Sequence, residues 1–269
     1  MKFGSTRVRA LGAALMVVAL GTTLVACGGD DDDDDAASSD TTAAAEGASA
    51  DVAEVCDINI QVGAATAPIF EAEDPEGVKA AYAESGVADL FDQVEALDLP
   101  AELSGPLGEA MDTIRTAGET GDTSGLQDFD TTDIDAWFYD NCDYQQVPVT
   151  AKEYEFDGLP ATLDAGATSF KLTNEGEEMH EIVIARKADG VTDSWDDILA
   201  LPEEEAMAKV SIAGAAFAPI GQTGYFATDL DTGDYVAVCF IPQGTKSFED
   251  QLDAPPHMVL GMKHEFTVS

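Results

Sequence analysis

The stretch GDYVAVCFIP, residues 233–242, has the period-two alternation of a β-strand. Successive side chains of a strand point to opposite faces of its sheet, so Tyr235, Ala237 and Cys239 share one face. The opposite face carries Val236, Val238 and Phe240. The strand therefore ends with a thiol on one defined face of a predicted sheet.

Runs of the same kind surround this strand from residue 147 onward. They are VPVTAKEYEF, TSFKLTN, HEIVIA and GYFATDL, with turn signals such as DAG at 164–166 and DTGD at 231–234. Short strands separated by turns predict an all-β sandwich or barrel over 146–269. Residues 189–212 interrupt the pattern, because SWDDILALPEEEAMAKV reads as one or two short helices restarted at Pro202. We expect this insertion to cover one end of the sandwich.

The region 51–145 has helical periodicity instead. Its apolar stripes are Leu90, Phe91, Val94 and Leu97, followed by Leu103, Leu107, Met111 and Ile114. In TTDIDAWFYDNC, Thr132 is placed to cap a last short helix that ends at Cys142. The pattern predicts a small α-helical domain. It contains no histidine and few basic residues, so we expect no catalytic site in it.

The N-terminus, residues 1–27, is interpreted as a targeting segment. Three cations, Lys2, Arg7 and Arg9, precede an apolar run that is short for a membrane-spanning helix, although an uncleaved anchor is the alternative. The end of this segment, LVAC, resembles the lipobox of bacterial lipoproteins. That resemblance implies lipidation of Cys27 and an extracytoplasmic protein anchored to the bacterial cell membrane. Residues 28–50, with a six-Asp run followed by Ala, Ser and Thr, predict an acidic disordered tether.

Acidic residues dominate the composition. The chain has 12 Lys plus Arg against 53 Asp plus Glu, a formal net charge of −41. Removal of the three leader cations leaves 9 basic residues and a mature charge of about −44. Such a surface repels phosphate backbones, so we expect no nucleic-acid partner. Acidity alone indicates solubility rather than a specific docking role.

The chain has four cysteines, and their positions suggest different roles. Cys56 on the predicted first helix and Cys142 at the end of the last one would staple the helical domain by a disulfide in an oxidising compartment. With Cys27 assigned to the lipid, Cys239 is left over. An unpaired thiol outside the cytoplasm is either an inert buried residue or a thiolate held by a metal.

The chain has only three histidines. His180 opens the strand HEIVIA and shares a face with Ile182 and Ile184. The stretch PPHMVLGM, residues 255–262, supplies His257 and Met262. Two imidazoles, a thiolate and a weak thioether are the donor set that suits copper in electron transfer. Each of these residues also has a simpler interpretation as part of a core.

These stretches resemble the cupredoxins, the blue copper family of plastocyanin and azurin, over about 147–269. NEGEEMHEIVI is similar to the strand of the first ligand, GDYVAVCFIP to the thiolate strand, and HMVLGMKHEFTV to the closing segment. The resemblance implies a Greek-key sandwich with one type 1 copper ion, held by His180, Cys239, His257 and, weakly, Met262. Met258 is a nearby alternative to Met262.

Two departures from the family concern the proposed site. Between Cys239 and His257 lie seventeen residues, FIPQGTKSFEDQLDAPP, where familiar members have only a few. Lengthening a surface loop costs only logarithmically more entropy, so the loop is compatible with a site. Glu181 follows His180 where many cupredoxins have an Asn that fixes the ligand loops, which leaves the order around the site open. His264 is expected to be structural or exposed.

The resemblance implies a single-electron carrier and not an enzyme, because three histidines cannot also furnish a catalytic copper cluster. The expected electron exit is the edge of His257, within an apolar patch that contacts a redox partner protein. That patch comprises Pro255, Pro256, Met258, Val259 and Leu260. The alternatives are a copper-free binding or scaffolding lipoprotein and a copper storage or delivery protein.

Overall fold

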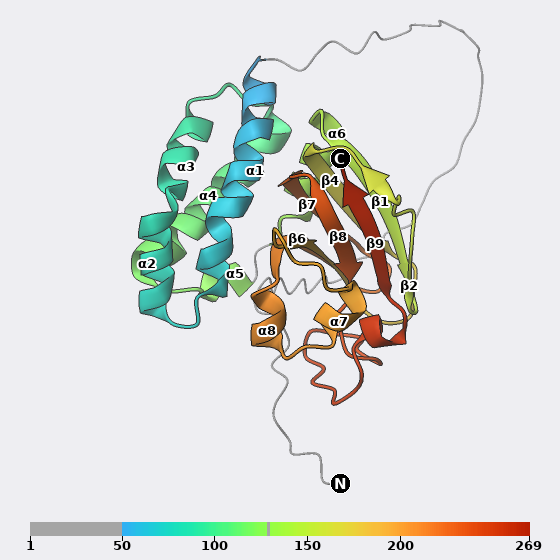
Figure 1. The fold of residues 1–269 in the computed structure, drawn as a ribbon. Helices are drawn as coiled ribbons and strands as arrows, with labels where there is room; N and C mark the ends of the chain where they lie inside the picture. The colour runs from blue at the N-terminus through green and yellow to red at the C-terminus, as the bar shows by residue number, and fades with distance from the viewer. Residues whose placement is uncertain (1–49, 128–129) are drawn as a thin grey trace, which may run out of the picture.

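The structure is a computed structural model that describes residues 50–127 and 130–269 (Figure 1). The predicted signal peptide, the predicted lipidation site Cys27 and the predicted tether over 28–50, apart from its last residue Ala50, lie outside these described residues. The helical half contains α1 Ala50–Glu71, α2 Pro75–Ser85, α3 Val87–Glu95, α4 Ala101–Thr120, α5 Ser124–Gln127 and α6 Thr132–Asn141. None of the helices in the described part of the chain is long and apolar enough to span a bilayer.

The C-terminal half begins at residue 145. Its strands are β1 Gln145–Lys152, β2 Glu155–Asp157, β3 Thr162–Leu163, β4 Gly166–Asn174, β5 His180–Lys187, β6 Val210–Ala218, β7 Thr223–Leu230, β8 Gly233–Val238 and β9 Lys263–Val268. Short helices interrupt them at α7 Trp195–Leu199, α8 Glu203–Met207 and the 3-10 turn η1 His257–Leu260. The change from helices to strands thus falls where the periodicity changes from 3.6 to two.

The predicted apolar stripes form the core of the helical half. Leu103, Met111 and Ile114 are buried along α4, and Phe91 and Val94 are buried on α3. Helix α2 begins where Asp74 accepts a 2.8 Å hydrogen bond from the Gly77 amide and where Pro75 takes the first helical position. The helical prediction for this region is therefore confirmed.

The predicted disulfide is present and joins Cys56 of α1 to Cys142, which caps the end of α6, with 5.7 Å between the Cα atoms. The Tyr144 hydroxyl donates to the Cys56 carbonyl and secures the same junction. The cap of α6 differs from the prediction, because Thr131 and not Thr132 precedes the helix. The Thr131 hydroxyl bonds the Asp135 carboxylate at 2.6 Å and makes no cap to a backbone amide.

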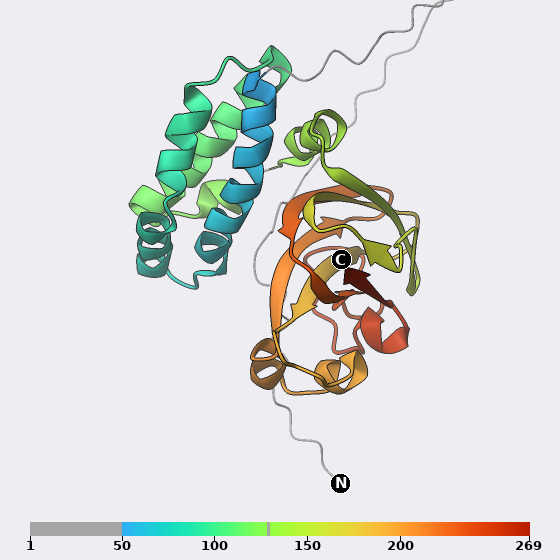
Figure 2. The same ribbon diagram turned by 45° about the horizontal axis from the view of Figure 1, so that its top comes forward.

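Two sheets form the C-terminal sandwich. One has the order β2-β1-β4-β7 and the other β3-β9-β8-β5-β6. The chain crosses between them at the β2–β3, β3–β4, β4–β5, β6–β7 and β7–β8 connections. Neighbouring strands are antiparallel except β1 with β4 and β3 with β9. In the turned view the two sheets curve around a shared interior (Figure 2). Repeated crossing between two packed sheets is the pattern of the predicted Greek-key sandwich.

The predicted strand faces are confirmed. Tyr235, Ala237 and Cys239 belong to the core between the sheets, together with Ile182 and Ile184 of the neighbouring strand β5. The opposite face of β8 buries Val236 and Val238 against Trp195 and Ile198 of α7. The inserted helices therefore cover the outer face of one sheet, and α8 starts after Pro202 as predicted.

Strand β6 and the two-residue strand β3 were missed, and the predicted insertion over 189–212 was too long. Strand β6 begins at Val210 and pairs with β5 from Lys187 back to His180. Its sequence, VSIAGAAFA, is rich in small residues that have low strand propensity. A Cβ at Gly214 would lie 2.4 Å from the Phe226 ring, so a small residue is required there by packing that the local sequence does not reveal.

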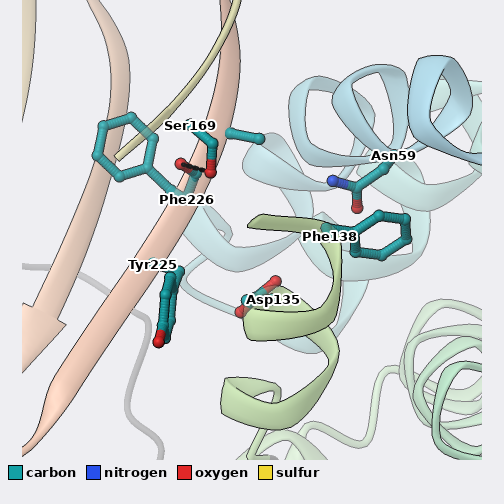
Figure 3. Close-up of a pocket in the computed structure, with 7 residues that line it drawn as sticks. Asn59, Asp135, Phe138, Ser169, Tyr225 and Phe226 are labelled. Carbon is teal, nitrogen blue, oxygen red and sulfur yellow. Dashed lines mark hydrogen bonds between the residues drawn. The ribbon is translucent and has the colours of Figure 1, made fainter. Parts of the chain in front are cut away.

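The helical half packs on the sandwich through α1 and α6, which contact β7 (Figure 1). The Lys171 ammonium lies over the rings of Tyr139 and Tyr225, at 5.6 and 5.7 Å from the ring centroids. A small cavity remains at this junction, with Asp135 of α6 and Tyr225 of β7 among its walls (Figure 3). The junction is thus polar as well as apolar.

Candidate metal centre

Three of the predicted ligands converge at one end of the sandwich. His180 opens β5, Cys239 follows the end of β8, and His257 opens η1. The Nδ1 atoms of the two histidines lie 3.2 Å apart, and the Cys239 Sγ atom lies 3.4 Å from His257 Nδ1. Their three ligand atoms lie within 4.8 Å of one another, and no other such group occurs among residues 50–127 and 130–269.

The long loop returns His257 to the site because its two ends are joined by backbone hydrogen bonds. Pro242 forms a β-bridge with Pro256, and the Gln243 amide donates to the Pro255 carbonyl at 2.9 Å. Closer to the site, the His257 amide donates to the Ile241 carbonyl at 2.9 Å. The added residues therefore protrude from a closed base and do not disturb the ligand positions.

Met262 and Met258 lie on different sides of the sheet. Met262 is fully buried in the core that also contains Cys239, and its carbonyl accepts a hydrogen bond from the Cys239 amide at 3.2 Å. Met258 packs instead on the outer cluster with Val238. This arrangement favours Met262 as the thioether neighbour of the centre.

Burial determines the protonation of the donors. It lowers the pKa of both histidines, and for His180 the neighbouring His257 lowers it further. Neutral imidazoles have a lone pair for a metal. Burial raises the pKa of the Cys239 thiol well above its ordinary value, with Glu181 adding to the rise. A bound cation reverses this effect, because a thiol that coordinates a metal is deprotonated. The donor set fits one type 1 copper ion.

The sandwich is cupredoxin-like. His180 opens β5, Cys239 follows β8, and His257 and Met262 belong to and follow the turn η1. The four donors therefore stand along the chain in the order that the resemblance implies. The confirmation of the fold rests on this strand order and on the buried donors.

Solved structures similar to the cupredoxin-like half include copper proteins and a multicopper oxidase. A reduced auracyanin from Roseiflexus castenholzii is 21% identical, covering 46% of this chain and 97% of that one, with a TM-score of 0.32. Auracyanin A, a "blue" copper protein from Chloroflexus aurantiacus, is 17% identical, covering 46% and 98%, with a TM-score of 0.30. Rusticyanin from Thiobacillus ferrooxidans is 20% identical, covering 48% and 80%, with a TM-score of 0.28. No protein-family model and no curated protein matches the chain.

Glu181 replaces the Asn of many cupredoxins and ties the ligand strands together in its own way. Its side chain is buried, and its Oε1 atom accepts a 2.8 Å hydrogen bond from the Phe240 amide. The Glu181 amide in turn points at the Cys239 Sγ atom, 3.5 Å away. Burial raises the pKa of this carboxyl to about 7. Glu181 therefore connects the strand of His180 to the strand of Cys239.

Residues of NEGEEMHEIVI, the segment similar to the first-ligand strand of cupredoxins, also shape the turn before His180. Asn174 is buried and donates to the carbonyls of Glu178 and Ala218, at 2.8 Å each. Its own oxygen accepts the Gly176 amide at 2.8 Å. A Cβ at Gly176 would lie 2.8 Å from His180 Nε2, so only glycine leaves room for the imidazole. The Asn and Gly of NEGEEMHEIVI thus shape the ligand loop.

The edge of His257, the expected electron exit, is not exposed. The residue is fully buried, its Nε2 atom lies 3.0 Å from the Glu178 carboxylate, and the Tyr154 ring packs 4.8 Å from the imidazole centroid. Of the predicted apolar patch, Val259 and Leu260 are 65% and 39% exposed. The patch therefore lies beside a covered imidazole and not around an open one.

Three residues at the site were missed, namely Glu153, Tyr154 and Glu178. No motif marks Glu153 and Tyr154, because they follow β1 and reach the site only through the fold. Glu178 stood within the quoted ligand segment, but as one of three nearby acids it carried no distinguishing signal. His264 is not part of the centre, since its Nε2 atom contacts the Pro160 carbonyl at 3.2 Å, as expected for a structural residue.

Proposed function

We propose that this protein is an extracytoplasmic blue copper protein that carries single electrons. His180, Cys239 and His257 are its strong copper ligands, and Met262 is the weak axial one. The observation that carries the proposal is the convergence of two imidazole Nδ1 atoms and the Cys239 thiol at buried positions, Cys239 being the one free cysteine among the described residues. When bound, a copper ion supplies a one-electron couple between Cu(I) and Cu(II).

The protein contributes donor residues whose positions are fixed by backbone hydrogen bonds. The strong ligands stand at strand ends or in a turn held by backbone hydrogen bonds, including the Met258 amide to the Cys239 carbonyl at 2.9 Å. All three are fully buried, so water has no access to the donor atoms. A rigid, dry donor set favours electron transfer, because the surroundings reorganise little when the charge changes.

Partner binding is proposed to occur at the site end of the sandwich. Val259 and Leu260 expose apolar side chains next to η1, which suits a small interface that releases its partner quickly. The formal net charge of −41 would steer a redox partner with a basic surface. Lipidation at Cys27 would hold the protein at the bacterial cell membrane and restrict the search for that partner.

Copper titration tests the proposal. Full-length purified protein is titrated with Cu(II), and we expect an intense blue absorption with a narrow copper hyperfine splitting. Cys239→Ser is expected to remove the colour, because the thiolate is the ligand that produces it. Colourless wild-type protein would favour a copper-free binding or scaffolding lipoprotein. Blue protein without reversible voltammetry would favour copper storage or delivery.

A further inference from the structure

The two ligand imidazoles have carboxylates on their outer nitrogens. His257 Nε2 lies 3.0 Å from Glu178 Oε2, in hydrogen-bonding geometry. His180 Nε2 lies 3.4 Å from Glu153 Oε1, but no hydrogen bond forms there. The two imidazoles therefore differ, and only His257 has a carboxylate acceptor in line with its outer N–H.

Glu178 is held in place from three directions. Its Oε2 atom accepts the Gly244 amide at 2.5 Å, its Oε1 atom accepts the Tyr154 hydroxyl at 3.2 Å, and its backbone amide donates to Glu153 at 2.8 Å. The side chain is only 15% exposed. A carboxylate fixed in this way has little freedom to leave the imidazole.

The long loop over 240–256 is part of this arrangement. Gly244 takes a left-handed conformation with φ 89°, which a glycine adopts without strain, and its amide points at Glu178. The next residue, Thr245, accepts a 2.8 Å hydrogen bond from the Met179 amide through its carbonyl. The segment that lengthens the loop relative to the familiar cupredoxins therefore closes over the outer side of His257.

We propose that Glu178 is a positioning residue that selects the tautomer of His257 and tunes the copper couple. This inference rests on the proposed function for its redox part. A carboxylate that accepts the Nε2–H leaves Nδ1 unprotonated and aimed at the ligand cluster. It also raises the basicity of the ligand and adds negative charge, and both effects favour the more highly charged Cu(II) state. Glu178 thus lowers the reduction potential.

Glu178→Gln tests this proposal in the full chain, with Glu177→Gln as the control. Glu177 is the adjacent residue and is exposed, so the control makes the same change in net charge without the contact to His257. Loss of such an outer partner typically weakens metal binding by about 10- to 100-fold. A tenfold loss confined to Cu(II) raises the potential of a one-electron couple by about 59 mV. We expect such a rise for Glu178→Gln and none for Glu177→Gln.

A second measurement needs no metal. Nitrogen-15 NMR of the copper-free wild-type protein is expected to show His257 as the Nε2–H tautomer, with slow exchange of that proton. In Glu178→Gln the amide both donates and accepts, so we expect faster exchange and a mixture of tautomers. An Nδ1–H tautomer in the wild type would overturn the inference. Equal reduction potentials for Glu178→Gln and Glu177→Gln, in a protein that turns blue, would also overturn it.

Failure of the proposed function is distinguishable from failure of this inference. If the wild-type protein stays colourless with Cu(II), the redox role of the centre is rejected. The positioning role of Glu178 can still be tested by measuring the tautomer of His257. If the wild-type protein turns blue but Glu178→Gln leaves the potential unchanged, the proposed electron carrier is retained and the tuning role of Glu178 is rejected.

Discussion

Met258 is the second residue of the short turn η1, and Met262 follows the Gly261 that ends this turn, so both thioethers belong to the closing segment. Met262 shares the inner core with Cys239, and Met258 packs on the outer cluster under α7. The β8 sheet therefore separates the two sulfurs. Their chemistry is the same, so substitution of each isolates the effect of position.

Met262→Leu is expected to change the copper centre, and Met258→Leu is expected to leave it unchanged. The axial thioether tunes the potential of such centres, and its replacement by a side chain without a donor favours Cu(I). Voltammetry should therefore record a higher potential for Met262→Leu, with a changed visible spectrum. Both replacements conserve volume and should cost less than about 1.5 kcal/mol in unfolding free energy. A larger spectral change in Met258→Leu would assign the axial role to the other methionine.

Glu181 leads to a second prediction at this scale. Its carboxylate is the acceptor for the Phe240 amide, next to the Cys239 ligand. Glu181→Ala leaves that buried amide without a partner, and we expect a loss of about 1–3 kcal/mol in unfolding free energy. Glu181→Gln retains an acceptor oxygen and should lose much less, as measured by urea unfolding of the copper-free protein. Equal losses in the two variants would show that the hydrogen bond is not the source of the effect.

The ligands could be predicted from the sequence because they are few and chemically distinct. A chain with three histidines and one leftover cysteine leaves little choice, and each ligand stands at a recognisable strand end or turn. The residues behind the ligands could not be predicted in this way. Glu153 reaches His180 from another strand connection, and its carboxylate is one of 53 acidic residues in the chain. Distance in the fold, and not local pattern, gives such residues their role.

The same contrast holds for whole elements. Strand β8 was predicted because both its faces alternate cleanly, whereas β6 was missed because its small side chains resemble a loop. The insertion was predicted as one or two short helices restarted at Pro202. The structure shows two, and the Ser194 side chain accepts the Asp197 amide at 3.1 Å at the start of α7. Elements whose start signals stand in their own sequence, such as α8 after Pro202, can be predicted from that sequence. Strand β6 cannot, because a small residue is required at Gly214 by a distant neighbour, Phe226.

The disulfide gives a prediction at the scale of elements. Cys56 and Cys142 are 86 residues apart, so the bond restricts a long loop of the unfolded chain. Replacing both with serine is expected to lower the unfolding free energy of the helical half by about 2–5 kcal/mol. Helical circular dichroism during thermal unfolding measures this loss. The blue absorption should be unchanged at low temperature, because both cysteines belong to the helical core and not to the ligand cluster. Loss of colour on mutation would instead show that the helical half supports the centre.

At the scale of the whole molecule, the two halves meet at α6. Figure 3 shows Asp135 of this helix across from Tyr225 of β7, and Phe138 and Phe226 also line the small cavity. Burial raises the pKa of the Asp135 carboxyl to about 7, while its hydrogen bond from Thr131 opposes the rise. A carboxyl with a raised pKa keeps its proton in the folded protein at a pH where the unfolded chain has lost it.

This raised pKa predicts how stability depends on pH. Between about pH 4 and 7 the unfolded state loses the Asp135 proton first, so the contribution of this residue to stability falls as the pH rises through that window. Asp135→Asn removes the contribution. We therefore compare the unfolding free energy of Asp135→Asn with that of the wild type at each pH. The difference, variant minus wild type, should be higher at pH 8 than at pH 5 by on the order of 1–3 kcal/mol. Urea unfolding at both pH values measures the difference.

Asp133→Asn is the matched control, because Asp133 lies on the same helix, exposed and away from the β7 contact. It makes the same Asp-to-Asn replacement, so an effect of simply losing an acidic side chain from the surface of this helix appears in the control. Only a carboxyl held in the junction between the helices and the sandwich makes Asp135→Asn differ from Asp133→Asn. Identical pH profiles for the two would mean that Asp135 is solvated in solution, and that α6 does not close the junction against β7.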